Sequence, residues 1–509
     1  MGFYAIGVGG TGAKCIEALV YLCAAGVIEV NELYLLFVDA DKSNGTLERV
    51  NRSIKLYQEC KNLNLGTTDL FKTNIVVANP SIWSPLGERE NTNLEDFFGY
   101  DTLRQNNQNN HFADLFDVLY SADEKAASLK RGFRGHPSIG AAVMARTLDF
   151  ANTEPWVTFS NRISSDINEG QEAKIILSGS VFGGTGASGL PTIPKLIKEI
   201  IDTKANEKEV KAKIAAILMT PYFSFTPVKD LDIEDDKSKI KADSNSFLIR
   251  TQCALNYYYE SHYLKDCNPV YILGEHSLSS VNISKLGGPE QRNEPHFIEI
   301  FAALAMNNFF SEPTKNYQVI ARKEEKKIYW EDFPHKNRQA NSVKEKLAVL
   351  TRFSFAYLST YYPLLENLEE KKTFYQAPWY VDYFQRNKVN LSQVLKTDLL
   401  AIKNFCKGFL LWLANIQTSA KELDLELINW NKFALEQQKE EGGKKYKEVT
   451  LRNEFELSAF LNLLLPVSQQ SERGLSNLWQ NLCMSSVRDE KASGVGKFIR
   501  ALFEQCKLL

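Results

Sequence analysis

The sequence lacks the charge surplus that nucleic-acid-binding proteins usually carry. Its 60 lysines and arginines are balanced by 62 aspartates and glutamates, which leaves a formal net charge of −2. A duplex-binding domain more often has a basic excess that attracts phosphates. The overall composition therefore does not indicate a nucleic-acid partner.

Metal-binding and disulfide patterns are also missing. The eight cysteines are scattered without a C-x-x-C pair, and the six histidines form no H-x-x-x-H motif. Scattered cysteines in a long chain are typical of reduced, cytosolic thiols. We therefore expect neither a disulfide framework nor a metal site built from protein ligands.

No leader or membrane span is predicted. The start, MGFYAIGVGGTG, lacks the basic region and the long apolar run of a secretory signal. Ile6 stands where the myristoylation pattern needs Ser or Thr. An apolar run such as Phe409–Ala414 is far shorter than the ~18 residues of a spanning helix. We expect a cytoplasmic protein.

Residues 1–315 alternate short apolar runs with helical patterns. Strands are predicted at 3–8, 33–38, 174–178, 214–220 and 270–273, and helices at 13–25, 141–151, 187–201 and 294–310. Residues 50–130 are rich in Asn and Gln and are predicted to be an insertion with some helix at 112–122. This alternation is typical of a three-layer α/β domain with a parallel sheet.

Residues 316–509 are predicted to form a mainly α-helical domain. The helical patterns lie at 343–361, 392–413, 422–441 and 454–465. Aromatic residues cluster between 357 and 384. Core packing is the default explanation for this cluster, and a surface for a protein partner is the alternative.

Two glycine loops carry the chemistry. Gly9, Gly10, Thr11 and Gly12 follow the first strand, and Gly183, Gly184, Thr185 and Gly186 follow the strand at 174–178. Glycines let the backbone approach an anion, and the N–H groups of the following helix start attract phosphate. Since ligands of open α/β sheets bind at the carboxyl ends of strands, we expect both loops to converge on one polyphosphate.

Other interpretations of the first loop remain open. It fits a dinucleotide-binding fold, in which Asp39 would bind ribose, and it also fits a turn without a ligand. A dinucleotide-dependent oxidoreductase or an adenylating enzyme would leave the second loop unexplained. The Walker pattern G-x-x-x-x-G-K-[ST] is absent, which argues against an ordinary P-loop nucleotidase.

Five segments, in order along residues 1–310, resemble the tubulin/FtsZ superfamily. Phe182–Ser188 resembles the signature G-G-G-T-G-[ST]-G, and IGVGGTGAKCI resembles the first nucleotide loop, with Lys14 in place of a usual Asn. Gly135–Gly140 is similar to G-x-N-P-[ED]-x-G, and Thr220–Phe225 is similar to the strand end T-x-P-F. Val270–Leu278 resembles the segment before the base-contacting helix. The pattern is closer to divergent bacterial tubulin-like proteins than to FtsZ.

The resemblance implies roles for the matching residues. The first loop and Lys14 would contact the α- and β-phosphates, and the second loop the β- and γ-phosphates. Gly135, His136 and Ser138 would flank the γ-phosphate. Asp39 would lie near the phosphates or a Mg²⁺-bound water, with turn formation as its alternative role.

The central helix at 294–310 would begin under the base. Glu299 would accept two hydrogen bonds from guanine, and adenine offers no such pair. GTP is therefore the expected ligand, together with its product GDP. The alternative is that Glu299 is simply exposed on the helix.

Hydrolysis in this family is completed by an acidic loop of the next subunit. Asp332, with Glu331 as second choice, lies in a segment that resembles N-x-D-F, with Trp330 in the usual Asn position. Such an acid must lie about 3 Å from the attacking water. The resemblance implies a Mg²⁺-dependent GTPase that assembles head to tail. The alternatives are a surface turn at Asp332 and a non-catalytic nucleotide sensor or scaffold that binds a protein through its helical domain.

Overall fold

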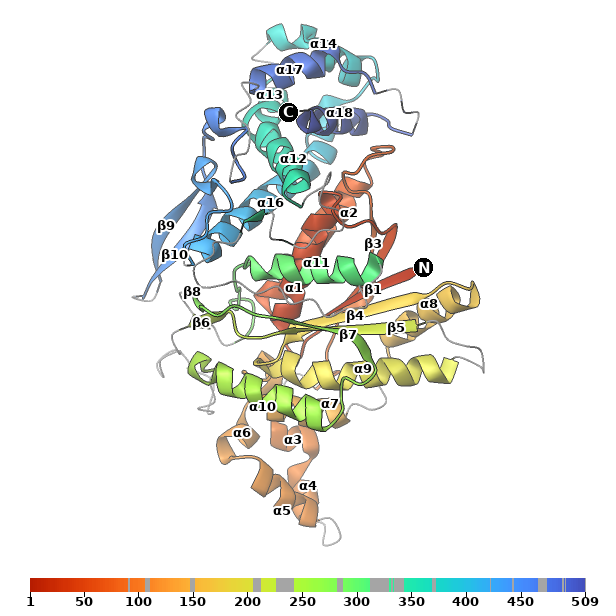
Figure 1. Ribbon diagram of the computed structural model, residues 1–509, viewed down its shortest axis with the longest axis vertical. Coiled ribbons are helices and arrows are strands. Elements are labelled where there is room, and N and C mark those ends of the chain that lie inside the picture. Colours follow the sequence, from red (N-terminus) through yellow and green to blue (C-terminus); the bar gives the residue numbers. More distant parts are fainter. Residues whose placement is uncertain are drawn as a thin grey trace. The chain divides into compact units, whose positions relative to one another are not determined.

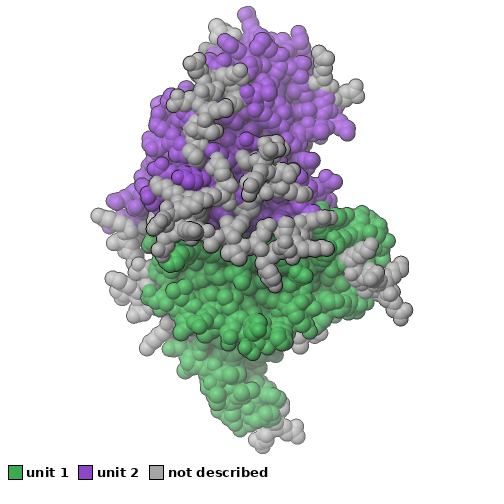
Figure 2. All heavy atoms as spheres, viewed as in Figure 1, with its two compact units in different colours: residues 1–16, 33–50, 76–294 green, residues 17–32, 51–75, 295–509 purple. Residues whose placement is uncertain are grey.

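The structure is a computed structural model of the full chain. The structure describes residues 1–89, 92–105, 110–146, 152–204, 212–225, 242–281, 287–311, 329–330, 333, 343–368, 372–421, 423–441, 444–465, 474–487, 489 and 491–508. Contacts divide the chain into two compact units, which Figure 2 colours separately. Unit 1 comprises residues 1–16, 33–50 and 76–294, and unit 2 comprises residues 17–32, 51–75 and 295–509.

A six-stranded sheet in the order β3-β2-β1-β4-β5-β7 forms the framework around the glycine loops (Figure 1). The strands are β1 (Gly2–Val8), β2 (Glu32–Val38), β3 (Asn74–Trp83), β4 (Ala173–Ser180), β5 (Ala212–Met219) and β7 (Cys267–Leu273). The pairs β1–β2, β1–β4, β4–β5 and β5–β7 are parallel. Every residue of β4 is buried, as in a strand covered on both faces. The predicted parallel α/β sheet is confirmed.

Helices of unit 1 cover this sheet and connect its strands. They include α7 (Pro137–Arg146), α8 (Trp156–Asn168), α9 (Gly184–Lys204) and α10 (Phe247–Glu260). Helix α9 packs against β1, β4 and β5, and also against α7 and α8. The buried core between them is built from branched aliphatic and aromatic side chains, such as Ile6, Leu177, Ile193 and Phe159.

The region from 50 to 130 is only partly an insertion. Helix α2 (Gly45–Lys61) and β3 belong to the α/β framework, and β3 lies at the edge of the main sheet. The apolar signal of β3 is interrupted by Asn79 and Pro80, and proline fits an edge strand better than a central one. The short helices α3 (Leu94–Phe98), α4 (Tyr100–Gln105), α5 (Asn110–Leu119) and α6 (Ala122–Ala126) form the true excursion.

The contacts place the division between the units earlier than the predicted boundary at 315. Helix α11 (Ile298–Ser311) corresponds to the predicted central helix and belongs to unit 2. It is apolar on nearly all sides, and ten of its residues are buried. Segments of helix α1 (Gly9–Ala24) and of α2 also belong to unit 2, so the units are not continuous along the chain.

Unit 2 is largely helical beyond α11. Its longer helices are α12 (Val343–Ala356), α16 (Asp398–Lys421), α17 (Leu475–Met484) and α18 (Val495–Lys507). Shorter turns are α13 (Tyr362–Glu366), α14 (Pro378–Tyr380) and α15 (Leu391–Val394). By length and composition, the described stretch Leu391–Lys421 could cross a membrane, but 61% of its apolar window is buried within the protein. Packing inside unit 2 accounts for this apolar character.

Two predicted helices of unit 2 are wrong. Residues 422–441 were expected to be helical, yet β9 (Ala434–Glu441) pairs with β10 (Lys444–Leu451) as an antiparallel hairpin. Glu436 and Lys447 form an ion pair across the two strands at 3.0 Å. In residues 454–465 the only helical turn is the short 3-10 turn Leu457–Ala459, and Leu464 forms an antiparallel bridge with Ile428. Lys, Glu and Gln favour helices, so the local pattern concealed the hairpin.

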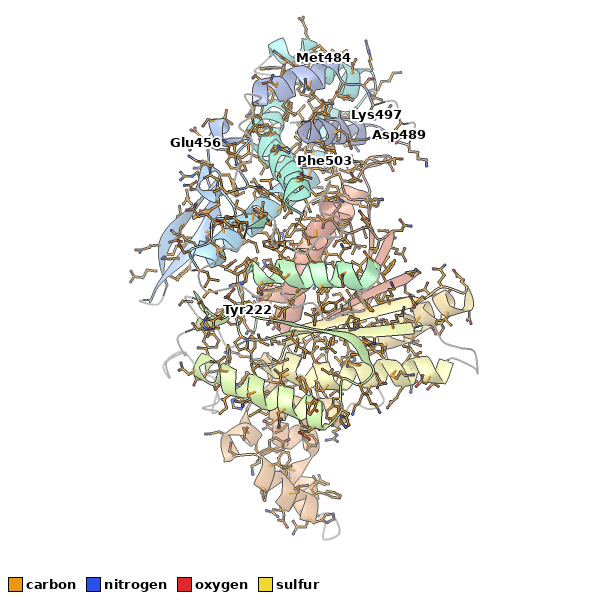
Figure 3. The ribbon with its side chains drawn as sticks, viewed as in Figure 1. Tyr222, Glu456, Met484, Asp489, Lys497 and Phe503 are labelled. Carbon is orange, nitrogen blue, oxygen red and sulfur yellow. The ribbon has the colours of Figure 1, made fainter. Side chains whose placement is uncertain are left out.

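The aromatic cluster of unit 2 is a packed core. Tyr361, Trp379 and Phe498 are each at most 1% exposed. The ring of Trp379 lies 5.3 Å from Phe498 and 5.5 Å from Trp479, measured between centroids. Phe503, which Figure 3 labels on α18, meets Phe353 edge-on with the ring centroids 5.9 Å apart. Core packing, the default explanation, therefore accounts for most of these aromatics.

Candidate functional site

The first glycine loop forms the start of α1. Gly9 has a φ of +72°, a conformation that side chains disfavour. A Cβ on Gly12 would lie 2.2 Å from the backbone oxygen of Ser178, so only glycine lets α1 approach β4 this closely. Gly10 and Thr11 are half-exposed, and a Cβ on Gly10 would meet only Asn44, at 3.9 Å. The loop is therefore packed at its base and open at Gly10.

The second loop forms the start of α9 in the same way. A Cβ on Gly186 would lie 2.4 Å from the backbone oxygen of Ser180. A Cβ on Gly184 would lie 2.8 Å from the Cβ of Phe133. Gly183 is half-exposed, whereas Gly184, Thr185 and Gly186 are buried. Each loop thus contains glycines that close packing requires and also residues that solvent can reach, namely Gly10 and Thr11 in the first loop and Gly183 in the second.

The structure brings the two loops together. Strands β1 and β4 are parallel neighbours, with Val8 opposite Gly179, so both loops leave the same edge of the sheet. A Cβ on Gly9 would lie 3.4 Å from the backbone nitrogen of Gly186 and equally close to the Cβ of Thr185. Residues about 170 positions apart therefore line one small region, as two loops serving one polyphosphate require.

The segment at Gly135 joins these loops. The Cβ position of Gly184 lies 3.2 Å from the Gly135 nitrogen, and Gly135 has a φ of +75°. The Arg250 guanidinium donates a hydrogen bond to the Gly135 carbonyl. His136 is half-buried, with Nδ1 3.5 Å from a Glu124 carboxylate oxygen, and Ser138 is exposed. Gly135 thus forms part of the loop cluster, while His136 has a carboxylate partner of its own.

Asp39 links the end of β2 to the second loop. Its carboxylate accepts hydrogen bonds from the Asp41 backbone nitrogen at 3.1 Å and from the Thr185 hydroxyl at 3.3 Å. Burial raises the pKa of Asp39 to about 7, and the neighbouring Asp41 carboxylate adds to this rise, while the two hydrogen bonds oppose it. The charge of Asp39 therefore changes near neutral pH, at the base of the loops.

A polar network that the sequence did not predict lies beside Asp39. The Asp41 carboxylate accepts hydrogen bonds from the backbone nitrogens of Ser43 and Gly288. Asn44 donates to the side-chain oxygen of Gln291 at 2.9 Å and is the nearest neighbour of Gly10. This network fixes the loop after β2 against residues 287–294. The run Asp39-Ala-Asp-Lys-Ser-Asn44 directly after a buried strand was the signal that could have revealed it.

Lys14 points toward protein groups. Its side chain is buried, and Nζ lies 3.2 Å from the Glu294 carbonyl oxygen. The same Nζ lies 5.1 Å from the ring centroid of Tyr222 and 5.4 Å from that of Phe223, within cation–π range. Figure 3 labels Tyr222, which follows β5. A phosphate contact by Lys14 remains a prediction.

The predicted base-binding residue lies in unit 2. Glu299 is fully buried in the first turn of α11, so the alternative of an exposed helix residue is wrong. Its carboxylate accepts a hydrogen bond from the His296 backbone nitrogen at 3.0 Å. This contact caps the helix start, and a contact with guanine remains a prediction.

The predicted catalytic acids Glu331 and Asp332 lie outside the described residues. Their neighbours Trp330 and Phe333 are buried in unit 2, and the two rings stack at 4.9 Å. The Trp330 indole donates a hydrogen bond to the Leu427 carbonyl. Trp330, which stands in the usual Asn position of the motif, is thus a packing residue.

Within the described ranges, no three His, Cys, Asp or Glu side chains gather closely enough to hold a metal. Mg²⁺ seldom uses such a cage, because it keeps several waters and takes one or two carboxylates plus the oxygens of a phosphate ligand. Asp39 and Thr185 offer oxygens of the required kind beside the glycine loops. These residues therefore fit Mg²⁺ that arrives with a nucleotide.

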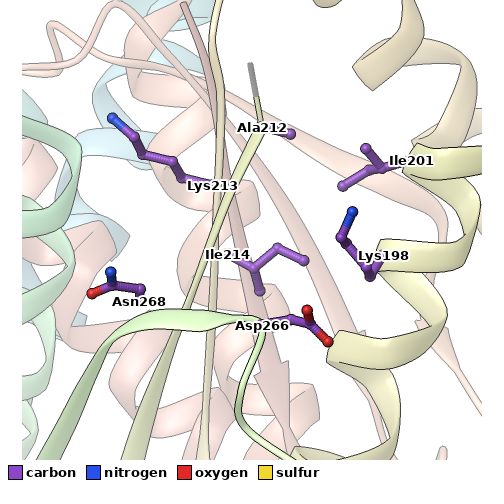
Figure 4. A pocket seen from close by; sticks show the side chains of 7 residues that line it. All are labelled: Lys198, Ile201, Ala212, Lys213, Ile214, Asp266 and Asn268. Carbon is purple, nitrogen blue, oxygen red and sulfur yellow. The ribbon is translucent and has the colours of Figure 1, made fainter. Parts of the chain in front are cut away.

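A cavity of about 250 Å³ lies elsewhere in unit 1 (Figure 4). It is lined by Lys198, Ile201, Ala212, Lys213, Ile214, Asp266 and Asn268. Ala212 begins β5 and Asp266 precedes β7, so this cavity lies at the amino ends of the strands. The glycine loops leave the carboxyl ends, and the cavity is therefore not part of the candidate site.

No model of a protein family matches the chain, and no curated protein matches it either.

Proposed function

We propose that this chain is a GTP-binding protein of the tubulin/FtsZ type. The observation that supports the proposal most strongly is the meeting of three glycine segments at the carboxyl edge of one parallel sheet. Gly9 approaches Gly186, and Gly184 approaches Gly135. Loops of this kind present backbone N–H groups and helix starts to an anion, and a triphosphate is long enough to contact all three.

In this proposal the backbone does most of the binding. The amides of Gly10, Thr11 and Gly12 hold the first two phosphates, and those of Gly184, Thr185 and Gly186 hold the terminal part. Helices α1 and α9 direct their positive ends at the same charge. The packing that excludes side chains at Gly12, Gly184 and Gly186 keeps these amides in place without a ligand, which lowers the entropic cost of binding.

Mg²⁺ would neutralise phosphate charge and join Asp39 and Thr185 to the nucleotide. Asp39 has to be ionised for this purpose, and its pKa of about 7 makes that state sensitive to pH. We therefore expect affinity for the Mg²⁺–nucleotide complex to increase as the pH rises through 7. Thr185 would keep the Asp39 carboxylate directed at the second loop.

The proposed reaction is hydrolysis of GTP to GDP and phosphate in a head-to-tail assembly, with Asp332 or Glu331 of the next subunit orienting the water. The alternative is a nucleotide sensor that does not hydrolyse GTP. A hydrolysis rate that rises with protein concentration and is lost in Asp332→Ala supports the enzyme. GTP binding without hydrolysis above background, at every protein concentration and equally in wild type and Asp332→Ala, supports the sensor.

Equilibrium binding of fluorescent GTP and ATP analogues to the purified full chain tests the proposal. The sharpest variant is Gly10→Asp, because a Cβ at Gly10 would meet only Asn44, at 3.9 Å, so the change adds a negative charge to the loop without a clash at the Cβ. Gly10→Asn is the matched neutral control. We expect Gly10→Asp to weaken GTP binding about 100-fold, a loss that corresponds to ~2.7 kcal/mol, and Gly10→Asn to weaken it far less. If the wild-type chain binds neither nucleotide, the proposal fails.

A further inference from the structure

The excursion formed by α3–α6, residues 94–126, presents an unusual helix. Helix α5 turns one face inward, where Ala113 and Phe116 are buried. Phe116 packs against Phe98, Tyr100 and Tyr120 with ring centroids 5.0–5.6 Å apart. This inner face packs α5 against the rest of the excursion, which Figure 1 shows extending beyond α7 and α10, away from the sheet.

The outer face of α5 is also apolar. The exposed fractions are 51% for Phe112, 53% for Leu115, 83% for Val118 and 58% for Leu119. Positions 112, 115 and 119 follow the spacing of one helix face, and Val118 lies beside them. A surface helix normally has a polar outer face, and several adjacent exposed apolar residues usually mark an interaction site. We call Phe112, Leu115, Val118 and Leu119 the outer α5 face.

The charges around this face limit what can bind to it. Residues 94–126 contain seven acidic residues and two basic ones. Both basic residues already pair with acids of the excursion. Arg104 pairs with Asp114 and Asp117, and Lys125 pairs with Asp117 and Glu95. The excursion therefore carries a net negative charge, and two of its acids, Asp114 and Asp117, lie on α5 itself beside the apolar face.

This combination favours one class of partner. A second copy of the excursion would bring like charges together, and so would a membrane rich in anionic lipids. We propose that the outer α5 face binds a basic amphipathic helix of a partner protein. The apolar side of that helix lies along Phe112, Leu115 and Leu119, and its lysines or arginines face the acidic surroundings. This proposal does not depend on nucleotide binding.

A designed peptide pair tests the proposal with the full chain and without nucleotide. One peptide is an amphipathic helix of leucine and lysine, and its counterpart carries glutamate in place of lysine. Fluorescence anisotropy of the labelled peptides measures affinity. We expect the lysine peptide to bind at least about tenfold more tightly than the glutamate peptide, with an affinity that falls as salt rises.

Matched variants locate the binding site. Leu115→Ser with Val118→Ser removes half of the outer α5 face, and we expect it to weaken binding of the lysine peptide at least about tenfold. The control is Leu248→Ser with Ile249→Ser on α10, where the side chains are 67% and 63% exposed. This control should leave the affinity within about twofold. All four side chains are exposed, so neither variant should disturb folding.

Three outcomes would overturn the proposal. The first is equal affinity for the two peptides, or equal loss in both double variants. The second is self-association of the wild-type chain that disappears in the Leu115/Val118 variant, since this would assign the face to a second copy. The third is flotation with phosphatidylglycerol vesicles that the same variant abolishes, since this would assign the face to a membrane.

Discussion

The glycine loops of unit 1 and the aromatic core of unit 2 maintain their shapes in opposite ways. At the loops, the absence of a side chain decides the geometry, because a Cβ on Gly12 would lie 2.2 Å from a backbone oxygen. In the core, large side chains decide it, because Trp379 is fully buried among other rings. A backbone constraint admits one residue type, whereas a core admits many combinations of similar volume. The identity of each loop glycine is therefore more tightly constrained than the identity of each core residue.

Trp379→Ala should have the largest effect on stability. The change removes a fully buried indole and leaves a cavity, so we expect a loss of about 3–5 kcal/mol in the free energy of unfolding. Urea unfolding, followed by circular dichroism, measures it. Met484→Ala on α17 is a control, because Met484 is 78% exposed and should contribute little. A loss below ~1 kcal/mol in Trp379→Ala would show that the aromatic cluster does not hold unit 2 together.

Asp39 should make stability depend on pH. Its folded pKa of about 7 lies above the ordinary aspartate pKa of 3.8, so the folded state binds the proton more tightly. The protonated Asp39 therefore contributes to the free energy of unfolding. This contribution is fully present below pH 3.8 and is lost as the pH rises through 7. Three pKa units at 1.36 kcal/mol each set an upper limit of about 4 kcal/mol. Urea unfolding at pH 5 and pH 8 should show the decline in wild type.

Asp39→Asn provides the comparison for that measurement. The amide cannot ionise, so the variant should lose this part of the pH dependence and should be more stable than wild type at pH 8. Binding of the Mg²⁺–nucleotide complex should weaken in the same variant. An unchanged pH profile would mean that Asp39 is ionised throughout and that its burial costs little.

Gly12→Ala should destabilise unit 1 by about 1–3 kcal/mol, the usual cost of overpacking. The added Cβ would meet the Ser178 oxygen and also the backbone of Gly7, neither of which can move easily. Thermal or urea unfolding gives the value. An unchanged free energy of unfolding would mean that α1 can shift away from β4. The close packing at Gly12 would then not hold the loop in place.

Gly10→Asn should have the smallest effect, with a change in the free energy of unfolding within ~0.5 kcal/mol. Gly10 lies two residues from Gly12 in the same loop, but its Cβ direction is open apart from Asn44. Gly12 is therefore a glycine because of close packing, whereas the space beside Gly10 is left open for a ligand. Equal destabilisation at both positions would remove this distinction.

The predictable part of the structure follows from strong local constraints. Strands such as 3–8 are continuous runs without charged side chains because the sheet is covered on both faces, and glycines follow where a helix start approaches the backbone. These two signals predicted the parallel sheet and the meeting of the two loops. For the buried parallel strands and the loop glycines, residue types alone were sufficient, because few other residue types fit a strand that is covered on both faces or a backbone that another backbone approaches closely.

Other features depended on partners that are distant in the sequence. The role of Asn44 depends on Gln291, 247 residues away, and no local pattern connects them. Strand β3 joins the sheet at its edge, where polar residues and Pro80 weaken the strand signal. Strand β9 consists largely of residues that favour helices, and cross-strand pairing with β10 outweighs that preference.

A structure of the full chain bound to a non-hydrolysable GTP analogue and Mg²⁺ tests the central claim most directly. The account predicts one triphosphate held by the backbone nitrogens of Gly10–Gly12 and Gly184–Gly186, with Asp39 on the metal side. Phosphates located instead in the cavity beside Lys198 and Asp266, or contacting only one of the two loops, would contradict it.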